Sequence, residues 1–234
     1  LPHCKGLLVA HFSSDHAALS LVDKLLQQAP SAVEYMDKPT LEASRGNIQQ
    51  AENRSWINGS PEAVLIIEFL SDTHKELDSN LMNCQSWLLL HKSYHVEVID
   101  VEEHYKVWEI RKAGLGLLMG KVGARKAVAV IEDAAVPLKY LYAYYKHMKD
   151  YMYSCGVNAV YYGHASVGLI HIRPELNLEN SSDRIKMIDI AKESSKVVKK
   201  YKGSLSGEHG DGRIRAAFLK EQFGEHVYQY LVDL

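Results

Sequence analysis

The chain has 234 residues, of which 47% are hydrophobic and 24% are charged. This composition is ordinary for a globular protein with one sizeable core or two small ones, and it excludes a collagen, a disordered chain and a disulfide-rich miniprotein. The net charge of −2 offers no general attraction to nucleic acid or anionic lipid, and no apolar run approaches the ~20 residues needed to span a bilayer.

The first hundred residues predict two β-α-β units. Short apolar runs predict strands at residues 7–12, 32–36, 63–70 and 95–99. A helix is expected after Asp15, which could cap it, and a longer helix over 73–91. Each unit is too short for a doubly wound sheet. The order therefore favours an α+β fold with a ferredoxin-like antiparallel sheet and helices packed on one face.

The rest of the chain continues the alternation of helices and strands. Helical patterns cover 101–119, 138–155 and 182–201, and strands are expected at 127–131 and as a bent pair over 157–172. A Gly-rich loop follows at 204–212, and a terminal helix is expected from Ile214.

Two segments concentrate the groups that can perform chemistry. His164 and His171 lie in the bent strand pair, where a bend is needed to bring both imidazoles to one point. Glu208 and His209 lie in a loop with three glycines, whose backbone can approach a ligand closely. Two imidazoles and the Glu208 carboxylate would form a three-ligand divalent-metal site with an open position, which leaves His209 to face a substrate as a base.

The nucleotide-binding and cysteine patterns of other redox proteins are missing from this sequence. It contains neither a GxxxxGK[ST] nor a GxGxxG motif, so these motifs do not predict a nucleotide-binding loop within these residues. Cys4, Cys84 and Cys155 are far apart, which predicts reduced, inert thiols and no iron–sulfur cluster within this chain.

These motifs resemble the C-terminal domain of FAD-linked oxidases, in the vanillyl-alcohol-oxidase-type superfamily. The sequence of these motifs is most similar to the branch of D-lactate, glycolate and D-2-hydroxyglutarate dehydrogenases. Within that branch it resembles the long form, in which this domain lies between an FAD-binding domain and an iron–sulfur domain. The resemblance is carried by Gly163-His164, His171, Gly207-Glu208-His209-Gly210, Trp108-x-x-Arg111, and Glu132-Asp133 before Pro137.

The resemblance implies a cap that covers the flavin and binds a small anionic D-2-hydroxy acid. It implies that His164, His171 and Glu208 ligate a divalent metal, often zinc, that His209 is the general base, and that Arg111 binds the substrate carboxylate. In such a site a metal bound to the 2-hydroxyl would lower the pKa of that hydroxyl, His209 would accept its proton, and the flavin would accept the hydride. FAD would be bound mainly by a domain outside this chain, and iron–sulfur clusters would lie elsewhere in the full-length protein.

The sequence departs from this family pattern at three places. The position of a substrate-contacting Lys of the D-2-hydroxyglutarate enzymes falls near Ile131, and the neighbouring Lys126 is not assigned as its replacement. Residues 166–169 replace the common Gly-Asp-Gly-Asn turn between the two histidines. Arg173 stands where many relatives have Asn, which predicts a second cationic clamp and favours a diacid substrate. Substrate identity therefore stays open among lactate, glycolate and 2-hydroxyglutarate types.

Residues 1–234 are expected to be one domain of a longer cytoplasmic protein. The chain lacks an initiator Met and stops within an amphipathic pattern, so we expect it to be inactive by itself. Peripheral attachment of the full-length protein to the inner membrane is compatible with this expectation. Two alternatives remain: a metal hydrolase using His164, His171 and Glu208, and a non-catalytic ferredoxin-like binding module.

Overall fold

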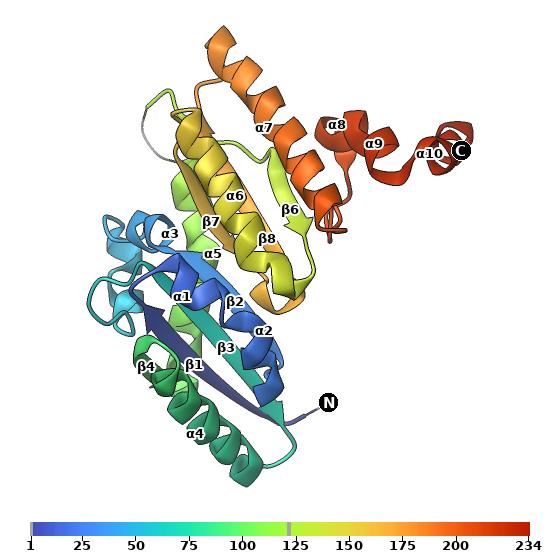
Figure 1. Cartoon of the computed structure of the whole chain (residues 1–234). Helices are drawn as coiled ribbons and strands as arrows, with labels where there is room; N and C mark the ends of the chain where they lie inside the picture. The colour runs from blue at the N-terminus through green and yellow to red at the C-terminus, as the bar shows by residue number, and fades with distance from the viewer. Residues whose placement is uncertain (1, 121–122) are drawn as a thin grey trace. The chain divides into compact units, whose positions relative to one another are not determined.

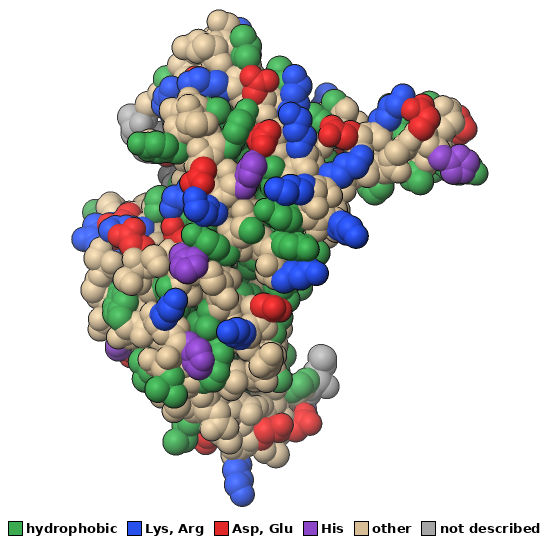
Figure 2. All heavy atoms as spheres, viewed as in Figure 1, with side chains coloured by type: hydrophobic (Ala, Val, Ile, Leu, Met, Phe, Trp, Pro, Cys, Tyr) green, Lys and Arg blue, Asp and Glu red, His purple; other side chains and the backbone are tan. Residues whose placement is uncertain are grey.

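The computed structural model describes residues 2–120 and 123–234, and Leu1 and residues 121–122 lie outside the described part. The chain divides into two compact units (Figure 1): residues 1–121 with 161–166 form unit 1, and residues 122–160 with 167–234 form unit 2. On the face shown in Figure 2, Lys and Arg side chains are interspersed with acidic and apolar ones. Within the described part, every helix is too short or too polar to cross a membrane.

Unit 1 is built on an antiparallel sheet with the strand order of a ferredoxin-like fold. The order is β4-β1-β3-β2, with β7 beside β2. The strands are β1 (Cys4–Phe12), β2 (Ala32–Asp37), β3 (Ala63–Ser71), β4 (Ser93–Ile99) and, from residue 161 onward, β7 (Ala159–Gly163). The helices are α1 (Asp15–Leu19), α2 (Val22–Leu25), α3 (Lys38–Ala43), α4 (His74–Leu90) and α5 (His104–Met119). The predicted α+β class and ferredoxin-like sheet are confirmed.

Helices cover both faces of the unit 1 sheet, whereas the sequence predicted them on one face. A side chain at Gly6 of β1 would meet Leu77 and Leu81 of α4, so α4 covers that face, as the ferredoxin-like pattern predicts. Alternate residues of a strand point to opposite faces, and the neighbouring Leu7 belongs to one buried cluster with Ile110 of α5. Because α5 buries the second face of the sheet, the strands are continuous apolar runs rather than alternating apolar and polar residues.

The first predicted helix differs in its cap and its continuity. Ser14 is the N-cap, because its Oγ accepts a hydrogen bond from Ala17 N at 3.1 Å. Asp15, the predicted cap, instead accepts a hydrogen bond from the Tyr35 hydroxyl at 2.8 Å. The helix ends at Ser20 and resumes as α2, so the expected single helix is two short ones.

Unit 2 combines a small antiparallel sheet with two long helices. Its strands β5 (Lys126–Ala127) and β6 (Ile131–Ala135) both pair with β8 (Leu169–Leu176). Its helices are α6 (Leu141–Ser154), α7 (Ser181–Lys200), α8 (Gly212–Arg215), α9 (Leu219–Phe223) and α10 (Glu225–Asp233). The expected terminal helix is thus broken into short pieces.

The predicted strand at 127–131 is wrong in its position. A turn over 128–130 separates β5 from β6, and β6 continues to Ala135. Glu132 and Asp133 therefore lie inside a strand rather than at its end. This shift matters because both side chains belong to the candidate site.

Gly168, just before β8, is expected to tolerate no side chain. Its φ is +73°, and a Cβ would lie 2.0 Å from the Val136 carbonyl oxygen. Gly168→Ala should lower the free energy of unfolding by more than ~2 kcal/mol in urea titrations, because the backbone must move. Gly156→Ala is the matched control: its φ is +64° in open space, so it carries only the left-handed penalty of ~1 kcal/mol. Equal losses for the two variants would contradict the predicted collision.

Candidate functional site

His171 is held in unit 2 by the neighbouring strand. Its side chain is 5% exposed on β8. Its Nδ1 hydrogen bonds to the main-chain carbonyl of Glu132 on β6. Because a carbonyl only accepts, Nδ1 carries the hydrogen and Nε2 keeps its lone pair in the neutral ring. That Nε2 lies 3.6 Å from Oε1 of Glu208.

The buried carboxylate of Asp133 holds the loop that carries Glu208 and His209. Its Oδ2 accepts hydrogen bonds from Ser206 Oγ at 2.8 Å, Glu208 N at 2.8 Å and His209 N at 2.7 Å. Its Oδ1 forms an ion pair with Arg215. Burial by itself raises the pKa of Asp133, but the bonds from the two amides, Arg215 and Ser206 outweigh it and keep the pKa well below the usual range.

Glu208 and His209 bring their functional groups together at the loop surface. His209 Nε2 lies 3.2 Å from Glu208 Oε1, and 54% of the His209 side chain is exposed. The rings of His171 and His209 are 6.1 Å apart between centroids. One carboxylate and two imidazoles of the predicted site are therefore neighbours within unit 2.

Glu132 is a member of this cluster that the sequence indicated only as a strand end. Its Oε1 pairs with Arg173, which is 4% exposed. Its Oε2 is buried and has no hydrogen-bond partner among the described residues. Ligand atoms of Glu132, His171 and His209 all lie within 4.8 Å of one another. Two adjacent carboxylates, Glu132 and Asp133, between apolar residues were the signal that could have identified it.

Unit 1 joins Arg111 and His164 through Glu34. Nε and Nη2 of Arg111 on α5 lie 3.0 and 2.9 Å from Oε2 of Glu34, and the guanidinium lies over the Tyr162 ring at 4.8 Å. The other carboxylate oxygen of Glu34 bonds to Nδ1 of His164 at 2.5 Å. Glu34 was missed by sequence reasoning, although a lone carboxylate inside the apolar strand at 32–36 is a usable signal.

The predicted residues thus fall into two groups, each described within its own unit. Arg111 and His164 belong to unit 1. The second group belongs to unit 2 and comprises His171, Arg173, Glu208 and His209.

A family model decides what kind of domain carries these groups. The model for FAD linked oxidases, C-terminal domain, matches residues 1–234. The chain belongs to this family. It is 26% identical over 242 residues to a D-2-hydroxyglutarate dehydrogenase from Pantoea ananatis and 27% identical over 242 residues to one from Escherichia coli, covering 99% of this chain each time. The match spans 24% of each relative, about a quarter of its length.

A solved oxidase structure shares the fold of this domain. 4-Ethylphenol oxidase from Gulosibacter chungangensis superposes with a TM-score of 0.66 at 8% sequence identity, over 99% of this chain and 51% of that one. At this identity the likeness shows the fold alone.

Asp133→Asn should lower the free energy of unfolding by ~3–5 kcal/mol at pH 7, because Arg215 loses its buried partner. The pKa of Asp133 is lower in the folded protein than in the unfolded chain, so its carboxylate stabilises the folded protein above the usual carboxyl pKa. This stabilisation fades as the pH falls toward the pKa of the folded protein. The difference in the free energy of unfolding between wild type and Asp133→Asn should therefore shrink between about pH 5 and pH 2 in urea titrations. Asp150→Asn, which removes an exposed pair with Lys146, should cost under ~0.5 kcal/mol. A gap for Asp133→Asn that does not change with pH would contradict this account.

Proposed function

We propose that this chain is the cap and substrate domain of an FAD-dependent oxidoreductase that oxidises a small D-2-hydroxy acid of the lactate, glycolate or 2-hydroxyglutarate type. The observation that carries the proposal is the cluster of His171, Glu208 and His209 in unit 2 of a chain from this family. FAD would be bound mainly by polypeptide outside residues 1–234. Any iron–sulfur cluster would also belong to that polypeptide.

His164, His171 and Glu208 are the proposed ligands of a divalent metal, zinc by the family resemblance. In metal-binding histidines, the ring nitrogen that does not bind the metal usually donates a hydrogen bond to a carboxylate or carbonyl. Both imidazoles have such a partner: Nδ1 of His171 bonds to the Glu132 carbonyl, and Nδ1 of His164 bonds to the Glu34 carboxylate. His164 belongs to unit 1, and we include it as a ligand because of its sequence motif and its hydrogen bond to Glu34.

The unpartnered Oε2 of Glu132 also fits a cation in this cluster. An unsatisfied buried carboxylate oxygen is costly, and a metal held beside His171 would satisfy it. We propose Glu132 as a further oxygen donor, with Arg173 fixing its other oxygen. His209 is assigned as the base rather than a ligand because its side chain is the most exposed in the cluster.

The chain's own residues would bind the substrate and move its proton. When bound, the metal would polarise the 2-hydroxyl and the flavin would accept the hydride. His209 accepts the hydroxyl proton, and the Glu208 carboxylate, 3.2 Å from its Nε2, stabilises the charged imidazole. Arg111 binds the substrate carboxylate through N–H groups beyond the two that face Glu34. Arg173 is supported less well as a second clamp, since it is buried against Glu132.

Removing one ligand should remove the metal from the full-length protein. His171→Ala and Glu208→Gln should each weaken zinc binding at least ~100-fold, and Glu132→Gln ~10- to 100-fold, in competition titrations with a chelator and by elemental analysis. His226→Ala is the control, because His226 is an exposed imidazole of α10. A wild-type protein that binds no divalent metal, or a His171→Ala variant that keeps it, would refute the site.

Arg111→Lys should raise KM for the hydroxy acid ~10-fold or more with a smaller change in kcat. A lysine cannot form the two parallel N–H bonds that a carboxylate accepts from a guanidinium. The assay is full-length protein, loaded with FAD, with a dye acceptor and D-lactate, glycolate and D-2-hydroxyglutarate in turn. Arg45→Lys, at an exposed pair with Glu42, should leave KM unchanged. Ester or amide hydrolysis without flavin would instead support the hydrolase alternative.

A further inference from the structure

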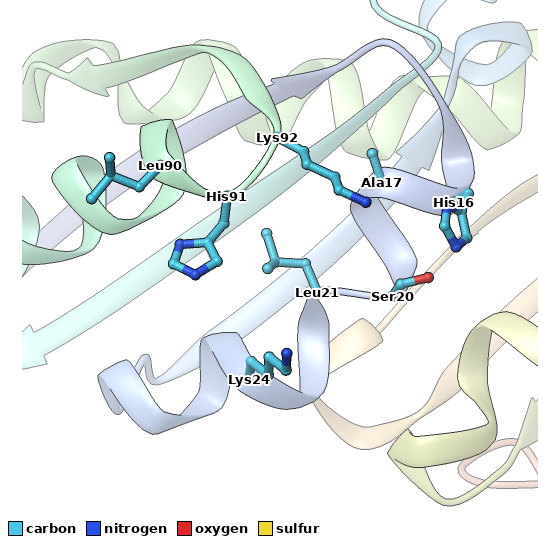
Figure 3. A pocket seen from close by; sticks show the side chains of 8 residues that line it. All are labelled: His16, Ala17, Ser20, Leu21, Lys24, Leu90, His91 and Lys92. Atoms are coloured by element: carbon cyan, nitrogen blue, oxygen red, sulfur yellow. The ribbon is translucent and has the colours of Figure 1, made fainter.

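A separate pocket in unit 1 lies where α1 and α2 face the end of α4 (Figure 3). Its volume is about 360 Å³, which is within the range of small-molecule sites. The residues that line it are His16, Ala17, Ser20, Leu21, Lys24, Leu90, His91 and Lys92.

The lining of this pocket is basic and contains no carboxylate. Lys24 comes from α2 and Lys92 from the turn after α4. Among the described residues, neither ammonium group forms an ion pair. Asp15 and Asp23 lie on the same helices as His16 and Lys24 but do not line the pocket. Two positive charges therefore line the cavity and no carboxylate does, which favours an anion there.

One wall of the pocket is rigid and another is apolar. The His91 ring stacks on Trp87 with centroids 4.1 Å apart, and its Nδ1 donates to the Trp87 carbonyl at 2.7 Å. Leu21 contributes a buried apolar side chain, and Leu90 is 83% exposed. A ligand with both an anionic group and a short apolar body fits this combination.

Lys92 occupies a backbone position where glycine is usual. Its φ is +72°, in the left-handed region that follows many helices. Asn and Gly are the residues that adopt this conformation most readily. Replacing Lys92 with glycine is therefore a substitution that the backbone accepts readily.

We propose that this pocket binds an organic phosphate monoester, with the phosphate between Lys24 and Lys92 and the apolar part against Leu21. A phosphate monoester carries close to two negative charges near neutral pH, which matches two ammonium groups better than a carboxylate does. The site is independent of the proposed oxidation of a hydroxy acid.

Binding of phenyl phosphate to the full-length protein tests this site. Calorimetry should detect saturable binding that is tighter than that of inorganic phosphate, because the phenyl ring adds apolar contact. Hydrogen exchange should be slowed at residues 16–24 and 90–93. Lys24→Gln with Lys92→Gln should weaken binding at least ~10-fold. Lys75→Gln with Lys112→Gln, two lysines of unit 1 outside the pocket, should leave it unchanged.

A second variant separates binding from folding. Lys92→Gly removes one ammonium group while favouring the positive φ, so it should fold as well as wild type and still bind more weakly. No saturable binding of phenyl phosphate by wild type, or equal weakening in the control pair, would overturn the proposal. Retention on phosphatidylglycerol vesicles without binding of phenyl phosphate would also overturn it and would point to a lipid surface.

Discussion

The geometry of the candidate site in unit 2 depends on one buried carboxylate. Asp133 receives the amide hydrogens of Glu208 and His209 and pairs with Arg215 beneath the loop. A loop with three glycines has many accessible conformations, and a buried charge is stable only when its partners are in place. The same bonds that compensate the burial of Asp133 therefore restrict the positions of the proposed ligand and the proposed base.

Two adjacent residues of strand β6, Glu132 and Asp133, orient the candidate site through three chemical groups. The Glu132 carbonyl orients His171, the Glu132 carboxylate lies beside that ring with Arg173 on its other oxygen, and Asp133 holds the loop. In unit 1, Glu34 has a comparable role, since it contacts both Arg111 and His164. In both units a buried carboxylate on a strand orients the residues that the motifs had identified, which is the usual support of a preorganised site.

Much of the architecture was predictable because the strands are strongly apolar and short. The four strands of the ferredoxin-like order and helix α4 follow directly from periodicity. The misplaced strand near residue 130 has a local cause: Val128 to Val130 are as apolar as a strand, yet they form the turn between β5 and β6. The division of the first helix at Ser20 was likewise not visible, because its apolar spacing continues across the break.

The sequence by itself determined the fold class, the family resemblance and the residues proposed to carry the chemistry, because apolar periodicity and short motifs are local properties of the chain. Only the tertiary structure decided which groups orient them. Glu34 and Arg111 are 77 residues apart, and Asp133 and Arg215 are 82 apart. A buried charge must find a partner wherever the fold brings one, and that partner is set by strand pairing and helix packing rather than by neighbours in sequence.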